Sequence, residues 1–303
     1  MKKIFSITDE NDSSRLDRWF KRNICEVPQS LIEKNIRKGN IKVNSIKKKS
    51  SYKLKSNDKI TIKNFNFIAN QHKKVQEKYK ATKKDLSLSS DIFIENNENF
   101  VVINKPAGVS VQSGTKSKKN ILDILAKTKE FFNSSPYSVH RIDKDTTGIL
   151  IVAKNRKFAQ FFTSLFRIRK IHKTYLGIVV GNVEIKKGVL KDELLTFEGN
   201  KKIKSTAITN FTLLDSNNNL SLLKLNPITG RKHQLRKQLS NYGHPILGDN
   251  KYGLYNRYSN KKNLLMLHAY SINFSIVDKK YNFVAEPPLS FKKILKEKYL
   301  KIF

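Results

Sequence analysis

Several features that define common protein classes are scarce or absent in this sequence of 303 residues. Its single cysteine, Cys25, excludes an intramolecular disulfide and a zinc site made of several thiolates. The six histidines never occur at the i, i+4 spacing of a metal-binding helix, so we expect no metal. No apolar run is long enough to span a bilayer, and Met1-Lys2-Lys3 is followed by only four less polar residues. We therefore predict a cytoplasmic protein with no signal peptide and no membrane partner.

Acidic residues are also few. The chain has 60 Lys and Arg against 25 Asp and Glu, which gives a formal net charge of +35. Self-repulsion of this size opposes folding unless a polyanion relieves it, so we expect nucleic acid as the partner, bound in a salt-dependent way. The many Lys, Asn and Ile residues also fit an AT-rich genome. The charge therefore indicates a polyanion without saying which one.

Residues 14–63 are predicted to form a small domain of two helices packed on a small sheet. Ser14 and Asp17 have the spacing of a capping box at the start of the first helix. Pro28 begins the second helix and Gly39 ends it. Apolar residues recur at helical spacing in the first helix, namely Leu16, Trp19, Phe20 and Ile24. Short alternating segments then predict strands.

Residues 64–90 are polar and lack an apolar period, which predicts a flexible linker. Residues 91–303 are predicted to form a second, larger domain. Its expected strands include 92–94, 100–103, 149–153, 175–180, 207–214, 220–225 and 269–276, and its expected helices are 120–132, 155–167 and 292–303. Because the strands outnumber the helices and lack regular helical crossovers, we predict an α+β domain with a mixed, largely antiparallel sheet.

A polar segment that leads into an apolar run, HRIDKDTTGILIVAKN, spans residues 140–155. The run at 149–153 is rich in β-branched residues and too short for a stable helix, so we expect a strand covered on both faces. Such a strand would fix the preceding loop, and a carboxylate on a fixed loop is well placed for catalysis. Asp143 is the candidate. The other interpretation is that Asp143 and Asp145 only cap a turn.

Three later segments carry further polar residues that could meet Asp143. Lys173-Thr174-Tyr175 begins a strand, residues 228–239 begin a helix, and residues 243–249 form a tight turn. His233 and Arg236 are three residues apart, so they share a helix face.

A guanidinium opposite a loop carboxylate keeps the carboxylate ionised and oriented. We therefore consider Arg236 as the partner of Asp143, and Tyr175 as a flat apolar surface for a base. Each of these residues also has an ordinary interpretation, Tyr175 as a half-buried strand aromatic and Arg236 as a solvated helix residue.

Taken in order, the motifs resemble the bacterial pseudouridine synthases that act on large-subunit ribosomal RNA. The motifs that carry the resemblance are Asn104-Lys105-Pro106-Ala107-Gly108, His140-Arg141-Ile142-Asp143, Lys173-Thr174-Tyr175, Gly230-Arg231-Lys232-His233-Gln234-Leu235-Arg236 and Leu267-His268-Ala269. Residues 14–62 resemble the small RNA-binding domain first described in ribosomal protein S4. The Ser-Arg pair common in that domain is Gln29-Ser30 here. Ile142, Lys232 and Leu235 depart mildly from the family pattern, and none of them removes a reactive group.

The resemblance implies that the protein isomerises uridine to pseudouridine in that RNA. It implies that Asp143 is the catalytic carboxylate, that Tyr175 lies on or beside the target base, and that Arg236 pairs with Asp143. The nucleotide would be flipped out of its helix, with Arg141 filling the gap. No cofactor or metal is needed, and we expect a monomer. The expected RNA-binding residues are Arg141, His140, Arg15, Ser30, Lys34, Arg37 and Lys38.

Alternative interpretations of this sequence remain open. A noncatalytic ribosome-assembly factor could keep the fold and the RNA contacts. A metal-dependent nuclease could use His140, Asp143 and Asp145. The basic face formed by Lys34, Arg37 and Lys38 fits RNA binding and also fits the solvated surface of a lysine-rich protein.

Overall fold

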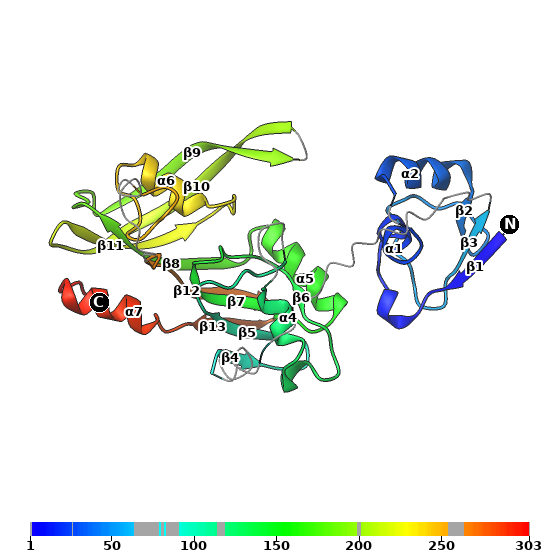
Figure 1. Ribbon diagram of the computed structural model, residues 1–303, viewed down its shortest axis with the longest axis horizontal. Helices are drawn as coiled ribbons and strands as arrows, with labels where there is room; N and C mark the ends of the chain where they lie inside the picture. Colours follow the sequence, from blue (N-terminus) through cyan, green and yellow to red (C-terminus); the bar gives the residue numbers. More distant parts are fainter. Residues whose placement is uncertain are drawn as a thin grey trace. The chain divides into compact units, whose positions relative to one another are not determined.

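The computed structural model divides into two compact units, residues 1–78 and 79–303 (Figure 1). The residues that it describes are 2–25, 27–63, 79, 82, 91–113, 119–198, 201–253 and 264–302. Apart from Tyr79 and Thr82, the predicted linker at 64–90 lies outside the described residues.

The first unit packs two helices on a small antiparallel sheet. Its sheet has the order β1-β3-β2, and its elements are β1 (Lys2–Ser6), the 3-10 helix η1 (Asp9–Asn11), α1 (Leu16–Asn23), α2 (Gln29–Lys38), β2 (Ile41–Val43) and β3 (Lys59–Lys63). The apolar faces of both helices meet the sheet in one core, where Phe20, Ile32, Ile41 and Ile60 are fully buried. The two helices predicted from the apolar spacing are confirmed, whereas no strand was predicted for β1.

The predicted capping box at the start of α1 is wrong. The N-cap residue is Arg15, and its side chain makes no capping hydrogen bond. Asp17 is buried, and its carboxylate accepts hydrogen bonds from Arg15 Nη2 at 2.6 Å and from Gln29 Nε2 at 2.9 Å. The Asp17 carboxylate therefore joins the start of α1 to the first residue of α2, and it also accepts from the Arg18 amide of its own helix at 2.8 Å.

The second unit is built on one large mixed sheet with the order β4-β5-β7-β12-β8-β11-β10-β9, to which β6 and β13 add at β7 and β12. Its strands are β4 (Phe93–Asn96), β5 (Phe100–Lys105), β6 (Tyr137–Ser138), β7 (Thr147–Ala153), β8 (His172–Val180), β9 (Lys187–Glu198), β10 (Lys201–Asn217), β11 (Leu220–Pro227), β12 (Leu267–Ile276) and β13 (Lys279–Val284). Only β7 and β12 pair in parallel among these described strands. The predicted α+β class with a mixed, largely antiparallel sheet is confirmed.

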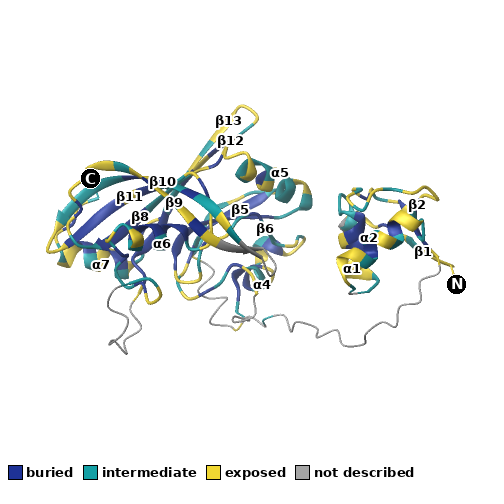
Figure 2. Cartoon of the chain, turned by 90° about the horizontal axis from the view of Figure 1, so that it is seen from above, coloured by how far each residue is buried: buried dark blue, intermediate teal, exposed yellow. Residues whose placement is uncertain are grey.

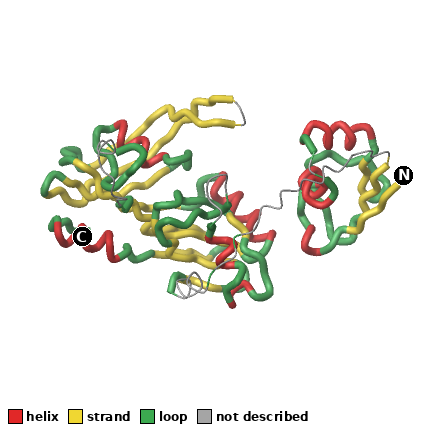
Figure 3. Tube along the Cα trace, in the orientation of Figure 1, coloured by secondary structure: helices red, strands yellow, loops and turns green. Residues whose placement is uncertain are grey.

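The helices of this unit pack against the faces of the sheet (Figure 3). They are α4 (Ile121–Leu125), the 3-10 helix η2 (Lys129–Phe131), α5 (Arg156–Arg167), α6 (Gln234–Asn241) and α7 (Leu289–Glu297). The helix predicted at 120–132 is too long, because α4 ends at Leu125. The helix predicted at 292–303 lies about one turn later than α7.

Strand β7 is covered on both faces, as its continuous apolar sequence predicted. Figure 2 shows buried strands, coloured dark blue, in the middle of this unit. Ile149 and Ile151 pack in one core with Phe162 of α5. Leu150 and Val152 face the opposite way and pack in a second core with residues of α4. A strand held on both faces has little freedom to move, so it fixes the loop that enters it.

The start of β7 is pinned to β12 by a close backbone approach. Gly148 has φ +106°, and a side chain there would collide with the backbone of Ala269, its neighbour in the parallel pairing. The buried imidazole of His268 hydrogen bonds through Nδ1 to Thr147 Oγ1 at 2.8 Å and through Nε2 to the Ala285 carbonyl at 2.9 Å. The loop that precedes β7 therefore ends at a rigid point.

Candidate active site

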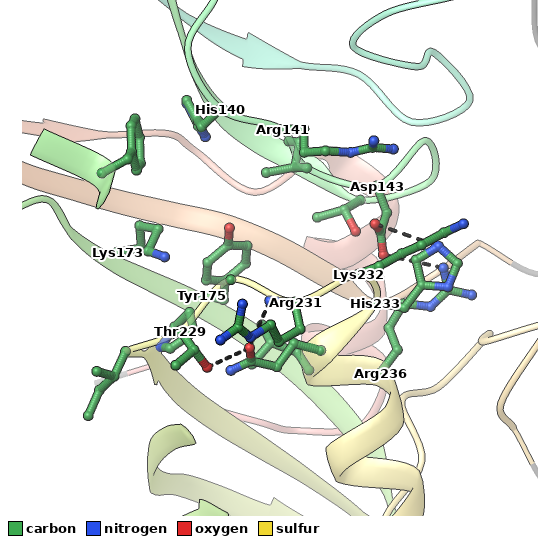
Figure 4. Close-up of a pocket in the computed structure, with 18 of the residues that line it drawn as sticks. His140, Arg141, Asp143, Lys173, Tyr175, Thr229, Arg231, Lys232, His233 and Arg236 are labelled. Atoms are coloured by element: carbon green, nitrogen blue, oxygen red, sulfur yellow. Dashed lines mark hydrogen bonds and ion pairs between the residues drawn. The ribbon is translucent and has the colours of Figure 1, made fainter. Parts of the chain in front are cut away.

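A cavity of about 550 Å³ opens in the second unit (Figure 4). Its walls come from the loop before β7, the end of α5, the start of β8, the loop between β11 and α6, and the first turn of α6. Asp143, Tyr175 and Arg236, which are far apart in the sequence, all line it. The structure therefore brings the three predicted catalytic residues together.

Asp143 presents its carboxylate to the cavity. The side chain is 19% exposed, and its Oδ2 lies 3.4 Å from Arg236 Nη1. The turn at this point is closed by the Asp143 backbone carbonyl, which accepts from the Thr146 amide at 3.2 Å. Among the described residues no backbone amide donates to the carboxylate itself. The alternative that the Asp143 side chain caps the turn is therefore not supported.

A buried lysine holds the backbone of the loop before β7 in place. Lys105, at the end of β5, has no exposed surface, and its Nζ donates to the carbonyls of Pro106, Val109 and Lys144 at 2.7, 2.9 and 3.0 Å. Burial lowers the pKa of Lys105 to about 7, against the opposing charges of Asp145 and Asp143. Because Lys144 follows Asp143, this ammonium sets the path of the backbone on which the carboxylate sits.

Arg236 has a stronger partner than the predicted one. Its Nε and Nη2 donate to the two carboxylate oxygens of Asp249 at 2.7 Å each, and both side chains are almost fully buried. Burial by itself would raise the pKa of Asp249, but the hydrogen bonds from Arg236 and from the Lys251 and Tyr252 amides bring it below the ordinary value. Asp249 therefore aligns the guanidinium so that Nη1 points to Asp143.

His233 lies beside the Asp143 carboxylate, but its position relative to α6 differs from the prediction. It is the N-cap of α6, in the left-handed region with φ 54° and ψ 33°, so it does not share a helix face with Arg236. Its Nδ1 is 2.9 Å from the Tyr252 hydroxyl, and its Nε2 is 3.8 Å from Asp143 Oδ1. Burial lowers the pKa of His233, and the charge of Asp143 opposes this change only in part.

Tyr175 is held by β8 at the floor of the cavity. Burial, followed by the nearby charge of Asp143, raises the pKa of Tyr175 well above its ordinary value. The phenol therefore stays protonated at neutral pH. Figure 4 shows its ring between Lys173 and Asp143 in this view, where it can face a planar ligand in the cavity.

His140 and Arg141, two of the predicted RNA-binding residues, also line the cavity. His140 Nε2 accepts a hydrogen bond from the Ile151 amide at 2.8 Å, and the ring stacks on Phe166 with centroids 4.6 Å apart. Burial, with repulsion from Lys173, lowers the pKa of His140 to about 3, so the imidazole is neutral. Arg141 is exposed. RNA binding by either residue stays a prediction.

The other predicted RNA-binding residues belong to the first unit. Arg15 is paired with Asp17. The remaining four are exposed on α2, namely Ser30, Lys34, Arg37 and Lys38.

Two features of the described part of the chain concern the other interpretations. No group of three or more His, Cys, Asp or Glu side chains there could hold a metal ion. His140, one of the three ligands that a metal-dependent nuclease would use, has its Nε2 occupied by the Ile151 amide. The same residues include no helix with the length and apolarity needed to cross a membrane.

Asp249, Tyr252 and Lys105 were not predicted as site residues. The turn at 243–249 was recognised in the sequence, but nothing in its pattern shows that its last residue meets a helix residue thirteen positions earlier. A buried arginine needs a carboxylate partner, and this requirement is the one signal that could have indicated Asp249 as the partner of Arg236.

Comparison with known proteins gives consistent matches. A family model described as RNA pseudouridylate synthase matches residues 99–241. Ribosomal large subunit pseudouridine synthase C of Buchnera aphidicola subsp. Baizongia pistaciae is 33% identical over 97% of this chain and 96% of that protein. The protein of the same name from Rickettsia felis is 35% identical over 92% of this chain and 95% of its own length.

The fold is also similar to that of solved structures. Human RNA pseudouridylate synthase domain containing 4 superposes with a TM-score of 0.59 at 28% identity, covering 70% of this chain and 94% of that one. Human RNA pseudouridylate synthase domain containing 1 gives a TM-score of 0.55 at 23% identity, over 66% and 85% of the two chains. These similarities agree with the resemblance that the sequence motifs indicate.

Proposed function

Because the chain belongs to the RNA pseudouridylate synthase family and is an RNA pseudouridine synthase, an isomerase, we propose that it converts specific uridines of large-subunit ribosomal RNA to pseudouridine with Asp143 as the catalytic carboxylate. The observation that carries this proposal is the position of Asp143. It is the only carboxylate among the described residues that line the cavity, and it lies with Arg236 and Tyr175.

The reaction rearranges bonds without changing the composition of the RNA. The N1–C1′ glycosidic bond of uridine breaks, the uracil turns, and C5 bonds to C1′. The C5 proton is lost and N1 gains a proton. One carboxylate and proton transfers are therefore sufficient for this rearrangement.

Asp143 suits this reaction because an ionised carboxylate can either attack the sugar or remove a proton from it. Arg236 lies 3.4 Å from one carboxylate oxygen and holds it in one orientation. The detached uracil has to be retained while water is kept out, since water would hydrolyse the intermediate. The loop before β7 and the loop after β11 line the cavity, and we propose that they serve both tasks.

A uridine stacked inside RNA cannot reach Asp143, so we propose that it is flipped into the cavity at a cost of a few kcal/mol. Tyr175 then lies against the base, as a protonated phenol that adds no negative charge beside Asp143. Arg141, exposed at the edge of the cavity two residues from Asp143, fills the gap left in the RNA stack.

We propose that residues 14–63 act as an S4-like RNA-binding domain that tethers the catalytic domain, residues 91–303, to its substrate. Its exposed helix α2 presents Lys34, Arg37 and Lys38 to the phosphate backbone. A tether raises the local concentration of the catalytic domain without adding base contacts at the site.

Release of tritium from C5 tests this function. Large-subunit ribosomal RNA made with uridine labelled by tritium at C5 is incubated with the purified full-length chain. We expect tritium in the water and pseudouridine in the RNA, at a rate unchanged by a chelator. If no tritium is released, the enzymatic proposal fails, and the RNA-binding assembly factor becomes the better account. If the RNA is instead cut in a chelator-sensitive way, the nuclease interpretation is correct.

A further inference from the structure

The charges that line the cavity are strongly unbalanced. Its described lining includes seven Arg and Lys side chains and one carboxylate, Asp143. The Asp143 carboxylate forms an ion pair with Arg236, whose charge is already neutralised by Asp249. No further carboxylate of the described lining balances the cations on the other walls, so the cavity favours an anionic ligand.

Lys173 is the most confined of these cations. It is the second residue of β8, two residues before Tyr175, and alternate residues of a strand point to the same face. The side chain is half-buried, and burial lowers the pKa of Lys173. Within the described part of the chain, no carboxylate pairs with its ammonium. A half-buried ammonium without a counter-charge costs stability unless a ligand supplies the charge.

Two arginines from the segment just before Lys173 also line the cavity. Arg167 is the last residue of α5, and Arg169 lies in the turn that connects α5 to β8. Both are exposed and line the cavity with Lys173. Arg169 has φ 59°, a left-handed conformation that non-glycine residues seldom adopt. A strained residue of this kind is often kept where its side chain is needed.

We propose that Lys173, with Arg167 and Arg169, forms a phosphate subsite that binds the phosphodiester adjoining the target uridine. This inference rests on the proposed function, since it assumes that the nucleotide in the cavity belongs to RNA. Lys173 donates to a non-bridging phosphate oxygen inside the cavity, and the two guanidiniums contact the same backbone at its edge.

The spacing along β8 fits a nucleotide. Two residues of a strand span about 7 Å, a separation similar to that between a base and its own phosphate. With the base against Tyr175, the phosphate falls near Lys173, on the side of the ring away from Asp143 in Figure 4. The sugar joins this phosphate to the base. The subsite therefore sets the position of the sugar along the cavity.

A paired change of protein and RNA tests this subsite. Short RNAs carry a uridine that mapping identifies as a target, with either an ordinary phosphodiester or a neutral methylphosphonate on each side of it in turn. Each RNA is bound to the full-length wild-type chain, Lys173→Met, Lys173→Arg and the control Lys170→Met. Lys170 is exposed in the same turn and does not line the cavity. The dissociation constant and the rate of tritium release are measured separately.

We expect Lys173→Met to weaken binding of the ordinary RNA by roughly 10-fold to 100-fold, the usual value of one charge-assisted hydrogen bond. One methylphosphonate position weakens wild-type binding by a similar factor and adds little to Lys173→Met. Lys173→Arg restores part of the loss, and Lys170→Met stays within about twofold of wild type. Lack of tritium release by wild type defeats the proposed function. If every methylphosphonate weakens Lys173→Met as much as it weakens wild type, the phosphate subsite is wrong even when the isomerase is active.

Discussion

Asp249 accepts two hydrogen bonds of 2.7 Å from Arg236, whereas Asp143 lies 3.4 Å from the third nitrogen of the same guanidinium. The two carboxylates therefore have different tasks. Asp249 is fully buried and fixes the arginine, while Asp143 is partly exposed and keeps free lone pairs that face the cavity. The short pair holds the geometry and the longer one leaves Asp143 available to react.

Asp249→Asn separates these two tasks. An amide cannot neutralise the buried guanidinium, so we expect the free energy of unfolding to fall by about 3 kcal/mol. At a temperature where the variant is folded, kcat should fall by at least about tenfold with little change in KM, because Arg236 no longer holds Asp143. Stability is measured by urea unfolding, and activity by tritium release.

Asp192→Asn is the matched control for Asp249→Asn. Asp192 also contacts α6, through Gln238 at 2.9 Å and Asn241 at 3.2 Å, but it does not touch Arg236. We expect it to lower stability modestly and to leave kcat near the wild-type value. Equal losses of kcat in both variants would show that α6 matters only for folding.

Lys105→Met tests the support beneath the catalytic loop. Three carbonyls lose the donor that a fully buried ammonium provides, so the free energy of unfolding should fall by about 3 kcal/mol. Lys292→Met, which breaks an exposed pair with Glu286, should change it by less than about 1 kcal/mol. Chemical unfolding of both variants gives the comparison, and similar small losses would mean that Lys105 does not hold the loop.

His140 should make the fold sensitive to acid. Its pKa is about 3 in the folded chain and 6.5 in the unfolded one, so between these values only the unfolded chain binds the proton. The contribution of His140 to the free energy of unfolding is therefore fully present above pH 6.5. Below that pH it falls by about 1.4 kcal/mol for each pH unit. His140→Gln removes the titration and should flatten this slope.

The comparison of wild type with His140→Gln isolates this residue, because other shifted groups such as His268 are common to both proteins. Urea unfolding at pH 7 and pH 5 provides the slopes. Parallel slopes in the two proteins would mean that the imidazole is not kept neutral by the fold.

Arg37→Ala with Lys38→Ala tests the RNA contacts of α2. Each lost phosphate contact should lower the slope of log affinity against log salt by about one and weaken binding equally for all RNA sequences. The matched control is Lys21→Ala with Arg22→Ala, which removes two exposed cations from the end of α1. If the control weakens binding and its salt slope as strongly, the α2 face has no special role.

The sequence predicted the parts of the fold that rest on local pattern. The apolar run of β7 and the apolar spacing of α1 are properties of a few consecutive residues, and the structure confirms them. Strand β9 was not predicted, because an edge strand needs no regular alternation of apolar and polar residues. On its inward face, the charged Asp192 stands between the buried Leu190 and Leu194. The partnership of Arg236 with Asp249 depends on how a distant turn folds back, which no local pattern records.

The central claim is that the Asp143 carboxylate isomerises uridines of large-subunit ribosomal RNA. Its most direct test is to map pseudouridine in that RNA from cells lacking this protein, after complementation with wild type or with Asp143→Asn. We predict that particular sites are lost in the deletion, return with wild type, and stay absent with Asp143→Asn although this variant folds and binds RNA. Return of those sites with Asp143→Asn, or no loss in the deletion, would contradict the account.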